Sequence, residues 1–314
     1  MSFTKRDFYA RSADGHHKLA GVVYEPQGEA KGYFHIVHGM TEHIARYDRI
    51  MTDLATEGYL CFGYDHLGHG KTAEDDSELG YIAKKDGYDL LCRDVKAFSD
   101  AVRAEYGGKY GKELPYYLMG HSMGSFIVRL ATERYITPEK LIIMGTGGSN
   151  PAAGAGIFLI DVIKLFKGDK HISKFVDTLA FGGYNKRFED ELSTAPSPWL
   201  TCDVEERKKY AADKYCTFHF TVSAMGDLMR LLKLSNRKAW YRNLPAIPIL
   251  LLSGENDPVG NYGKGICEVE NNLKKHGHCV TKILYTGARH EILNDFTYED
   301  VKRDILVFLD GAHN

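Results

Sequence analysis

Short runs of apolar residues recur along the chain and alternate with longer stretches in which apolar positions repeat every three or four residues. The apolar runs cover residues 32–37, 59–64, 116–119, 141–144, 247–253 and 280–285. The helical stretches have their apolar faces at Tyr47, Met51, Leu54 and Ala55, at Leu91, Val95, Phe98 and Val102, and at Val301, Ile305, Phe308 and Leu309. Continuous apolar runs are typical of a parallel sheet covered by helices on both faces, because neither face of such a strand meets water. The pattern predicts an α/β fold with a mostly parallel sheet, preceded by edge strands near residues 19–23.

The alternation of strands and helices stops after Gly145. Residues 149–238 contain helical patterns and aromatic side chains but no convincing strand. An insertion between two strands of one sheet is expected to lie over the carboxyl edge, where open α/β sheets bind their ligands. We therefore expect residues 1–148 and 239–314 to form one core in two parts, with residues 149–238 as a helical cap.

Composition narrows the class of protein. A chain of 314 residues can bury a large core, and a formal net charge of −2 gives no electrostatic basis for binding nucleic acid. Residues 1–7 lack the apolar stretch of a signal peptide, and no run reaches transmembrane length. Six cysteines occur without C-x-x-C spacing, which is typical of free thiols in a reducing compartment. We expect a cytoplasmic protein, or one loosely attached to a membrane surface.

One apolar run ends in Gly120-His121-Ser122-Met123-Gly124 and is followed at once by a helical pattern. Gly-x-Ser-x-Gly between a strand and a helix is the context of a nucleophile elbow, a strained turn that holds a serine hydroxyl above the sheet. Small residues at the two glycine positions let the strand and the helix approach closely. The start of the helix also offers free N–H groups to developing negative charge. The pattern predicts Ser122 as a catalytic nucleophile, with a structural glycine–serine turn as the alternative.

A serine hydroxyl needs a base to act as a nucleophile near neutral pH, and the base needs an acid to orient it. In elbow-type hydrolases these groups follow in the order serine, acid, histidine, each on a loop after a later strand. Asp257 and His290 directly follow the last two apolar runs. We expect Asp257 as the acid and His290 as the base. Glu255 is the nearest rival acid, and Asp295 is a poorer one because it follows the histidine.

An oxyanion hole requires two backbone donors. The N–H of Met123, immediately after the nucleophile, is one candidate. The loop His38-Gly39-Met40 follows the first buried run and supplies the other, with the N–H of Met40 as the expected donor. A plain strand-to-helix turn is the alternative for His38-Gly39.

Two groups of histidines could bind a metal: His66 with His69, and His276 with His278 and Cys279. Neither group has a third and a fourth ligand in line, so surface or turn positions are favoured. We expect no metal and no organic cofactor.

Five segments together carry a family resemblance. They are His38-Gly39-Met40-Thr41-Glu42-His43, Arg46-Tyr47, Asp65-His66-Leu67-Gly68-His69-Gly70, Gly120-His121-Ser122-Met123-Gly124 and Gly287-Ala288-Arg289-His290-Glu291. The combination resembles the monoacylglycerol lipase and lysophospholipase family of α/β-hydrolases over nearly the whole chain, and residues 198–213 are similar to that family's cap. The resemblance implies a triad of Ser122, Asp257 and His290, with Met40 and Met123 as oxyanion donors.

Two positions depart from the family pattern. Ser125 stands where many relatives carry a glycine, and Met40 stands where the mammalian lipases have a smaller residue. A bulkier side chain at position 40 would narrow an acyl pocket, which leaves the preferred chain length open.

The residues and the resemblance together predict a serine carboxylic-ester hydrolase that acts on monoacyl lipids. The head group and the oligomeric state are left open. A capped serine aminopeptidase is a second interpretation, but it needs an acidic cluster for the substrate's α-amine, and the inserted segment offers no such site. A ligand receptor without catalytic activity on the same scaffold is a third, which turnover would exclude.

Residues 157–166 of the insertion form an unusually apolar helical stretch. Asp161 and Lys164 share one narrow side, and apolar residues cover well over half of the circumference. A helix packed on one side needs only about a 100° apolar stripe. The excess suits two roles, lining an acyl pocket and touching lipid or a partner, and burial within the cap is the equally weighted alternative. Ile160 lies at one margin of the stripe, so an exposed helix is expected to tolerate glutamate there.

Overall fold

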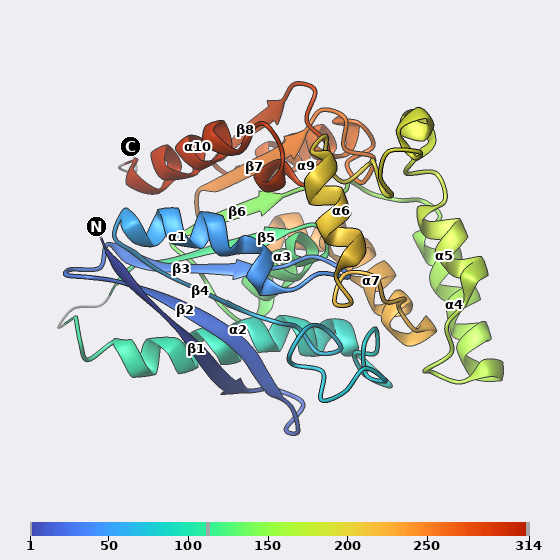
Figure 1. Cartoon of the computed structure of the whole chain (residues 1–314), viewed down its shortest axis with the longest axis horizontal. Coiled ribbons are helices and arrows are strands. Elements are labelled where there is room, and N and C mark those ends of the chain that lie inside the picture. The colour runs from blue at the N-terminus through green and yellow to red at the C-terminus, as the bar shows by residue number, and fades with distance from the viewer. Residues whose placement is uncertain (1, 111–113, 312–314) are drawn as a thin grey trace.

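The apolar runs form the strands of a single sheet. The computed structural model describes residues 2–110 and 114–311, and its eight strands pair in the order β1-β2-β4-β3-β5-β6-β7-β8 (Figure 1). The bounds are Phe3–Arg11 (β1), Lys18–Pro26 (β2), Gly32–Val37 (β3), Tyr59–Tyr64 (β4), Tyr116–His121 (β5), Lys140–Met144 (β6), Ile249–Gly254 (β7) and Val280–Tyr285 (β8). All pairs from β4 across to β8 are parallel, and the β1–β2 hairpin joins β4 in the antiparallel sense. The prediction of a mostly parallel sheet is confirmed.

The start of β7 differs from the apolar run that predicted it. The run begins at Ile247, whereas β7 begins at Ile249. Pro248 has no N–H to donate to the ladder. Its carbonyl oxygen does accept a hydrogen bond from the Leu141 N–H at 3.0 Å. The proline therefore joins the sheet on one side only, and the strand starts after it.

Helices cover both faces of the sheet, and each face buries its own apolar cluster. These helices are α1 (Asp48–Thr56), α2 (Gly87–Tyr106), α3 (Met123–Arg134), α9 (Lys264–Lys275) and α10 (Tyr298–Asp310). Residues such as Met51 and Ile305 belong to the cluster under α1 and α10, and Phe98 and Ile127 belong to the cluster under α2, α3 and α9. Phe308, expected on the buried face of the last helix, is only half-buried at the margin of its cluster.

The segment between β6 and β7 is helical, and residues 149–238 are called the cap segment below. It contains α4 (Ala153–Lys167), α5 (Lys174–Phe181), the 3-10 turn η2 (Lys186–Glu191), α6 (Val204–Ala212) and α7 (Val222–Ser235). The helix α8 (Lys238–Asn243) leads back to the sheet, and two further 3-10 turns are η1 (Ile44–Tyr47) and η3 (Ile292–Asn294). Figure 1 shows α4, α5 and α6 beyond the arrowheads of the parallel strands. Within residues 2–110 and 114–311, no helix is both long and apolar enough to cross a bilayer.

Candidate active site

Ser122 occupies the turn between β5 and α3. Its backbone has φ 53° and ψ −120°, a region that costs a non-glycine residue energy. The two flanking glycines permit the turn: a Cβ at Gly120 would lie 2.3 Å from the carbonyl oxygen of Gly124, and a Cβ at Gly124 would lie 2.1 Å from that of Val37. The Ser122 N–H donates to the Met144 carbonyl at 3.0 Å, which ties the turn to β6. This is the strained strand-to-helix turn that the sequence predicts, and Ser122 remains partly exposed.

Asp257 and His290 lie on the loops after β7 and β8 and are in direct contact. Asp257 Oδ2 is 2.9 Å from His290 Nδ1, and both residues are buried. The other oxygen of Asp257 accepts the N–H of Val259 at 2.8 Å, which fixes the carboxylate. A proton held on Nδ1 by this contact leaves Nε2 as the basic nitrogen.

The two rival acids have other surroundings. Glu255 is exposed to solvent. Asp295 is buried, but its oxygens accept backbone N–H groups of Cys202, Arg289 and Phe296. The structure therefore brings Asp257, rather than Glu255 or Asp295, to the histidine.

The loop after β3 passes directly against the serine turn. A Cβ at Gly39 would lie 3.0 Å from Ser122 Cβ and 2.6 Å from Glu42 Oε1, so only glycine fits there. Met40 follows and is partly exposed, and Thr41 has a positive φ of 49°. Met123 is the first residue of α3, where backbone N–H groups have no acceptor within the helix. Both expected oxyanion donors therefore belong to segments that border Ser122.

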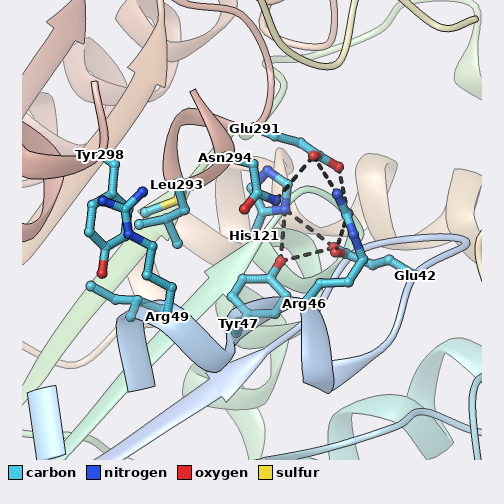
Figure 2. A pocket seen from close by; sticks show the side chains of 11 residues that line it. Glu42, Arg46, Tyr47, Arg49, His121, Glu291, Leu293, Asn294 and Tyr298 are labelled. Atoms are coloured by element: carbon cyan, nitrogen blue, oxygen red, sulfur yellow. Dashed lines mark hydrogen bonds and ion pairs between the residues drawn. The ribbon is translucent and has the colours of Figure 1, made fainter. Parts of the chain in front are cut away.

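A buried polar network joins these loops (Figure 2). Glu42 accepts hydrogen bonds from the Gly39 N–H and, at 2.9 Å, from the Tyr47 hydroxyl. The Arg46 guanidinium donates to Glu42 at 3.0 Å and forms two bonds of 2.7 Å with Glu291. Each carboxylate belongs to a loop that carries a predicted site residue, since Glu42 lies near Met40 and Glu291 follows His290. The arginine therefore ties the loop of Met40 to the loop of His290.

His121 connects the same network to the serine turn. Its Nε2–H donates to the carbonyl of His290 at 3.2 Å, and its Nδ1 lies 3.3 Å from Glu42 Oε1. Burial alone lowers the pKa of a histidine, but the hydrogen bond and charge of Glu42 raise the pKa of His121 above its ordinary value. Burial likewise raises the pKa of a carboxyl, but His121 and Arg46 hold the pKa of Glu42 well below its usual range. The network is therefore a charged one, with its partners in contact.

A second histidine cluster supports the loop after β3. His38, His66 and His69 are fully buried, and the His66 N–H donates to His38 Nε2 at 3.0 Å. Burial lowers the pKa of His66 to about 3 and that of His69 to about 4, so both are neutral near pH 7. His66 and His69 lie in a turn, as expected, since the His69 N–H donates to the His66 carbonyl at 3.0 Å. The turn is buried rather than at the surface, and the His69 ring contacts Phe218 and Phe220 of the cap segment.

The cap segment contacts His290, and sequence reasoning did not predict this particular contact. The Trp199 ring lies 5.1 Å from the His290 ring, centroid to centroid. The Glu291 N–H donates to the Leu200 carbonyl at 2.7 Å, and Arg289 donates to the Pro198 carbonyl at 2.6 Å. The sequence predicted a cap over the carboxyl edge of the sheet, but neither the tryptophan nor the prolines beside it specify which side chain they contact.

Residues 28–297 of the chain match the model of a family described as serine aminopeptidase, S33. The chain belongs to this family. A monoglyceride lipase homolog of Monkeypox virus is 24% identical over 287 residues, which are 90% of this chain and 89% of that protein. Human monoglyceride lipase is 35% identical over 124 residues, 39% of this chain and 37% of its own length.

A solved structure of a thermostable carboxyl esterase from Bacillus coagulans, in complex with glycerol, has a TM-score of 0.89 and 28% identity. It covers 99% of this chain and 99% of its own. This member of the serine aminopeptidase family is thus an enzyme, a serine hydrolase with the α/β-hydrolase fold of the monoglyceride lipase type.

Proposed function

We propose that the chain is a carboxylic-ester hydrolase that cleaves monoacyl lipids, either monoacylglycerols or lysophospholipids, through an acyl-enzyme on Ser122. The observation that carries the proposal is the buried 2.9 Å contact of Asp257 with His290, on loops beside a serine in a strained turn. The names of its relatives support an ester as the substrate, since they include monoglyceride lipases and a carboxyl esterase.

In the proposed reaction, Ser122 Oγ attacks the ester carbonyl carbon while His290 Nε2 takes the hydroxyl proton. Asp257 holds the imidazole and stabilises the imidazolium that forms. The negative oxygen of the tetrahedral intermediate accepts the N–H groups of Met40 and Met123. The intermediate collapses, and the departing alcohol takes the proton from His290.

The second half of the reaction repeats these steps with water. His290 removes a proton from water, which attacks the acyl-enzyme carbonyl. Collapse releases the fatty acid and returns the proton to Ser122. Every proton passes through one imidazole nitrogen, so the fixed tautomer of His290 serves both halves.

We propose that residues 149–238 act as a cap and that this cap contacts aggregated lipid through α4 and α5. The polar side of α4 faces α7: Asp161 pairs with Arg230 at 2.6 Å, and Lys164 donates to Ser223 at 2.9 Å. Three large apolar side chains of α4 point outward: Phe158, Leu165 and Phe166 are exposed by 72%, 79% and 78%. On α5, Phe175 and Leu179 are exposed by 62% and 65%. Clustered exposed apolar side chains are typical of an interaction surface.

Ile160 is a correction to the sequence interpretation. It is buried, with 3% exposure, and packs toward Gly226 of α7 rather than lying at an exposed margin. A glutamate at position 160 therefore disrupts packing and does not test lipid contact. Phe166, at the end of α4, is the appropriate position for that test.

A serine aminopeptidase remains a second candidate, because the matching family carries that description. An α-amine needs a carboxylate that is available to it. Glu191, the acidic residue of the cap segment that contacts the loop of the base, is already paired with Arg289 and Arg207. This pairing favours the ester over the amine.

A substrate panel tests the proposal. Purified protein is assayed with short nitrophenyl esters, monoacylglycerols, lysophospholipids and aminoacyl amides, and a fluorophosphonate adduct is mapped by peptide mass spectrometry. We expect the adduct on Ser122 and the highest kcat/KM on a monoacyl lipid. Preference for aminoacyl amides would establish the peptidase, and binding without turnover of any of them would establish a receptor.

A further inference from the structure

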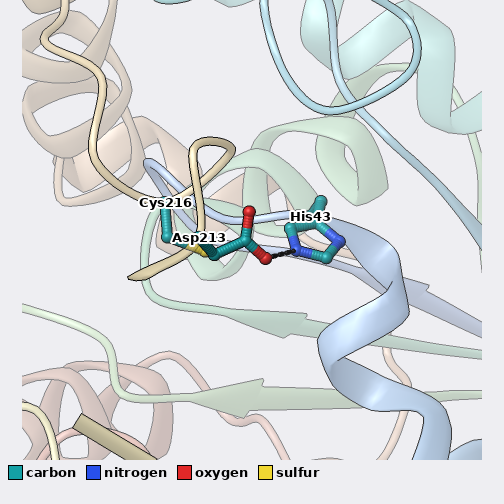
Figure 3. A group of neighbouring side chains, drawn as sticks. All are labelled: His43, Asp213 and Cys216. Carbon is teal, nitrogen blue, oxygen red and sulfur yellow. Dashed lines mark hydrogen bonds and ion pairs between the residues drawn. The ribbon is translucent and has the colours of Figure 1, made fainter. Parts of the chain in front are cut away.

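Three side chains with metal-ligating atoms meet where the cap segment contacts the loop after β3 (Figure 3). They are His43, Asp213 and Cys216, and their donor atoms all lie within 4.8 Å of one another. His43 is on the loop that carries Met40, and Asp213 and Cys216 follow α6. Some 170 residues separate the two parts in sequence, so spacing did not reveal the group.

The two donors from the cap segment are held by their own turn. Asp213 Oδ1 accepts the Tyr215 N–H at 2.8 Å, which leaves Oδ2 directed at His43 Nε2, 2.9 Å away. The Asp213 carbonyl accepts the Cys216 N–H at 3.0 Å. Cys216 is a free thiol with 2% exposure, and His43 packs edge-on against the Tyr215 ring.

We propose that His43, Asp213 and Cys216 bind a single Zn²⁺ ion, with water as the fourth ligand, and so join the cap segment to the loop of Met40. Imidazole nitrogen, carboxylate oxygen and thiolate sulfur are the three ligand types that zinc takes in proteins. Zinc–ligand bonds of about 2.0–2.3 Å in a tetrahedron place the donors roughly 3.3–3.7 Å apart. His43 Nε2 and Asp213 Oδ2 are 2.9 Å apart and every pair of donors lies within 4.8 Å, so the donors are already near the spacing that zinc needs.

Protonation and charge are compatible with this site. Burial raises the pKa of the Cys216 thiol, so zinc must displace the thiol proton, as it does at other cysteine sites. Arg46 is the cation that acts on Cys216, and its charge is already paired with Glu42 and Glu291. The surrounding charges are therefore close to balanced before the ion arrives.

The same two segments already touch beside the proposed site. The Tyr210 hydroxyl of α6 donates to the Thr41 carbonyl at 2.9 Å, and the Tyr210 ring lies over Arg46 at 4.9 Å. A bound ion would add a covalent-strength link to this junction. Zinc is thus expected to raise the melting temperature of the protein by binding only the folded chain.

Equilibrium dialysis with Zn²⁺ tests the proposal on the full chain. We expect one saturable site in the wild type and an unchanged affinity in Ser122→Ala, because the site does not depend on the proposed ester chemistry. Cys216→Ala, Asp213→Asn and His43→Gln should each weaken binding by more than about 100-fold, since loss of a ligand exceeds loss of a supporting hydrogen bond. His219→Gln is the matched control, because His219 pairs with Asp177 at 3.0 Å on the exposed cap segment without a cysteine.

Cobalt substitution identifies the sulfur ligand directly. Co²⁺ added to the wild type should give a near-ultraviolet sulfur-to-cobalt charge-transfer band, which Cys216→Ala removes and His219→Gln retains. Circular dichroism verifies that each variant is folded. If Cys216→Ala does not fold, Asp213→Asn, which changes a partly exposed position, replaces it in the metal-binding measurement. Absence of saturable binding in the wild type, or equal binding by wild type and the folded ligand variants, would overturn the site.

Discussion

The loops around Ser122 and the helix α4 of the cap segment differ in where they place charged and apolar side chains. In the loops around Ser122, charged groups are buried and paired with one another, as Arg46 is with Glu42 and Glu291. In the cap segment, the ion pair between Asp161 of α4 and Arg230 of α7 is partly exposed, and α4 leaves aromatic and aliphatic side chains in solvent. Buried ion pairs add little net stability but hold groups in one arrangement, whereas exposed apolar clusters favour association. The first arrangement holds side chains in fixed positions, and the second suits the lipid contact proposed for α4.

This difference teaches that chemistry and substrate access are separable in this molecule. A substitution in the loops around Ser122 should reduce the hydrolysis of every substrate, dissolved or aggregated. A change on the outer side of α4 should matter only when the substrate is part of an interface.

Replacement of the nucleophile should have the largest effect. Ser122→Ala removes the attacking oxygen, and loss of a nucleophile of this kind costs on the order of 10⁶-fold in kcat. We expect hydrolysis of soluble and micellar esters to fall together, with no labelling by a fluorophosphonate. Ser125→Ala is the control, because the Ser125 hydroxyl donates to the Ser122 carbonyl at 2.6 Å and is expected only to support the turn. Substantial turnover by Ser122→Ala would refute the assignment.

Replacement of Asp257, the proposed acid, should cause the second-largest loss of kcat. Asp257→Asn keeps the shape of the side chain but no longer fixes the proton on His290 Nδ1, a change worth about 10⁴-fold in kcat in triads of this kind. Glu255→Gln should change kcat by less than about threefold, because that side chain is exposed on the same loop. Steady-state kinetics on a nitrophenyl ester measure the loss of kcat in each of the two variants. A reversed order of the two losses would assign the acid to Glu255.

Regular features of the fold could be predicted from the sequence because they depend on local patterns. The run at 280–285 gives β8 residue for residue, and the glycines around Ser122 predict the turn that they permit. The contact of Asp257 with His290 also follows, since the ends of neighbouring parallel strands meet at one sheet edge.

Other features depend on contacts between distant segments and could not be read from local pattern. Ile160 and Phe166 are both apolar residues of α4, yet one is buried and the other exposed, because α7 covers only one side of the helix. Arg46 and Glu291 are 245 residues apart, and nothing in either segment indicates that they pair. The outer side of a helix is defined by its neighbours, which the helical pattern alone does not name.

A charge on the outer side of α4 should give a moderate and selective effect. Phe166→Glu places a carboxylate where lipid contact is proposed, and burial of a charge in lipid costs a few kcal/mol. We expect hydrolysis of micellar long-chain monoacylglycerol to fall about tenfold, while a short soluble nitrophenyl ester is hydrolysed at the wild-type rate. Ile160→Glu is the matched control, because it introduces the same charge at a buried position of the same helix and should lower the melting temperature and both activities. Equal retention of both activities by Phe166→Glu would show that α4 does not touch lipid.

The smallest effect should be a pH dependence of stability that originates at His121. Its pKa is raised in the folded chain, so its contribution to stability is complete below the unfolded value of about 6.5 and is lost as the pH rises through the folded pKa. The wild type should therefore have a higher free energy of unfolding than His121→Gln. This difference should be largest near pH 6 and should shrink toward pH 9, and urea unfolding of both proteins at a series of pH values measures it. His66→Gln is the contrasting control, since burial lowers the pKa of His66 to about 3, so only the unfolded chain binds a proton there near pH 6 and the difference from wild type should change in the opposite direction, growing slightly as the pH rises. A difference for His121→Gln that also grows with pH would mean that His121 is neutral in the folded chain and that Glu42 is balanced by Arg46 alone.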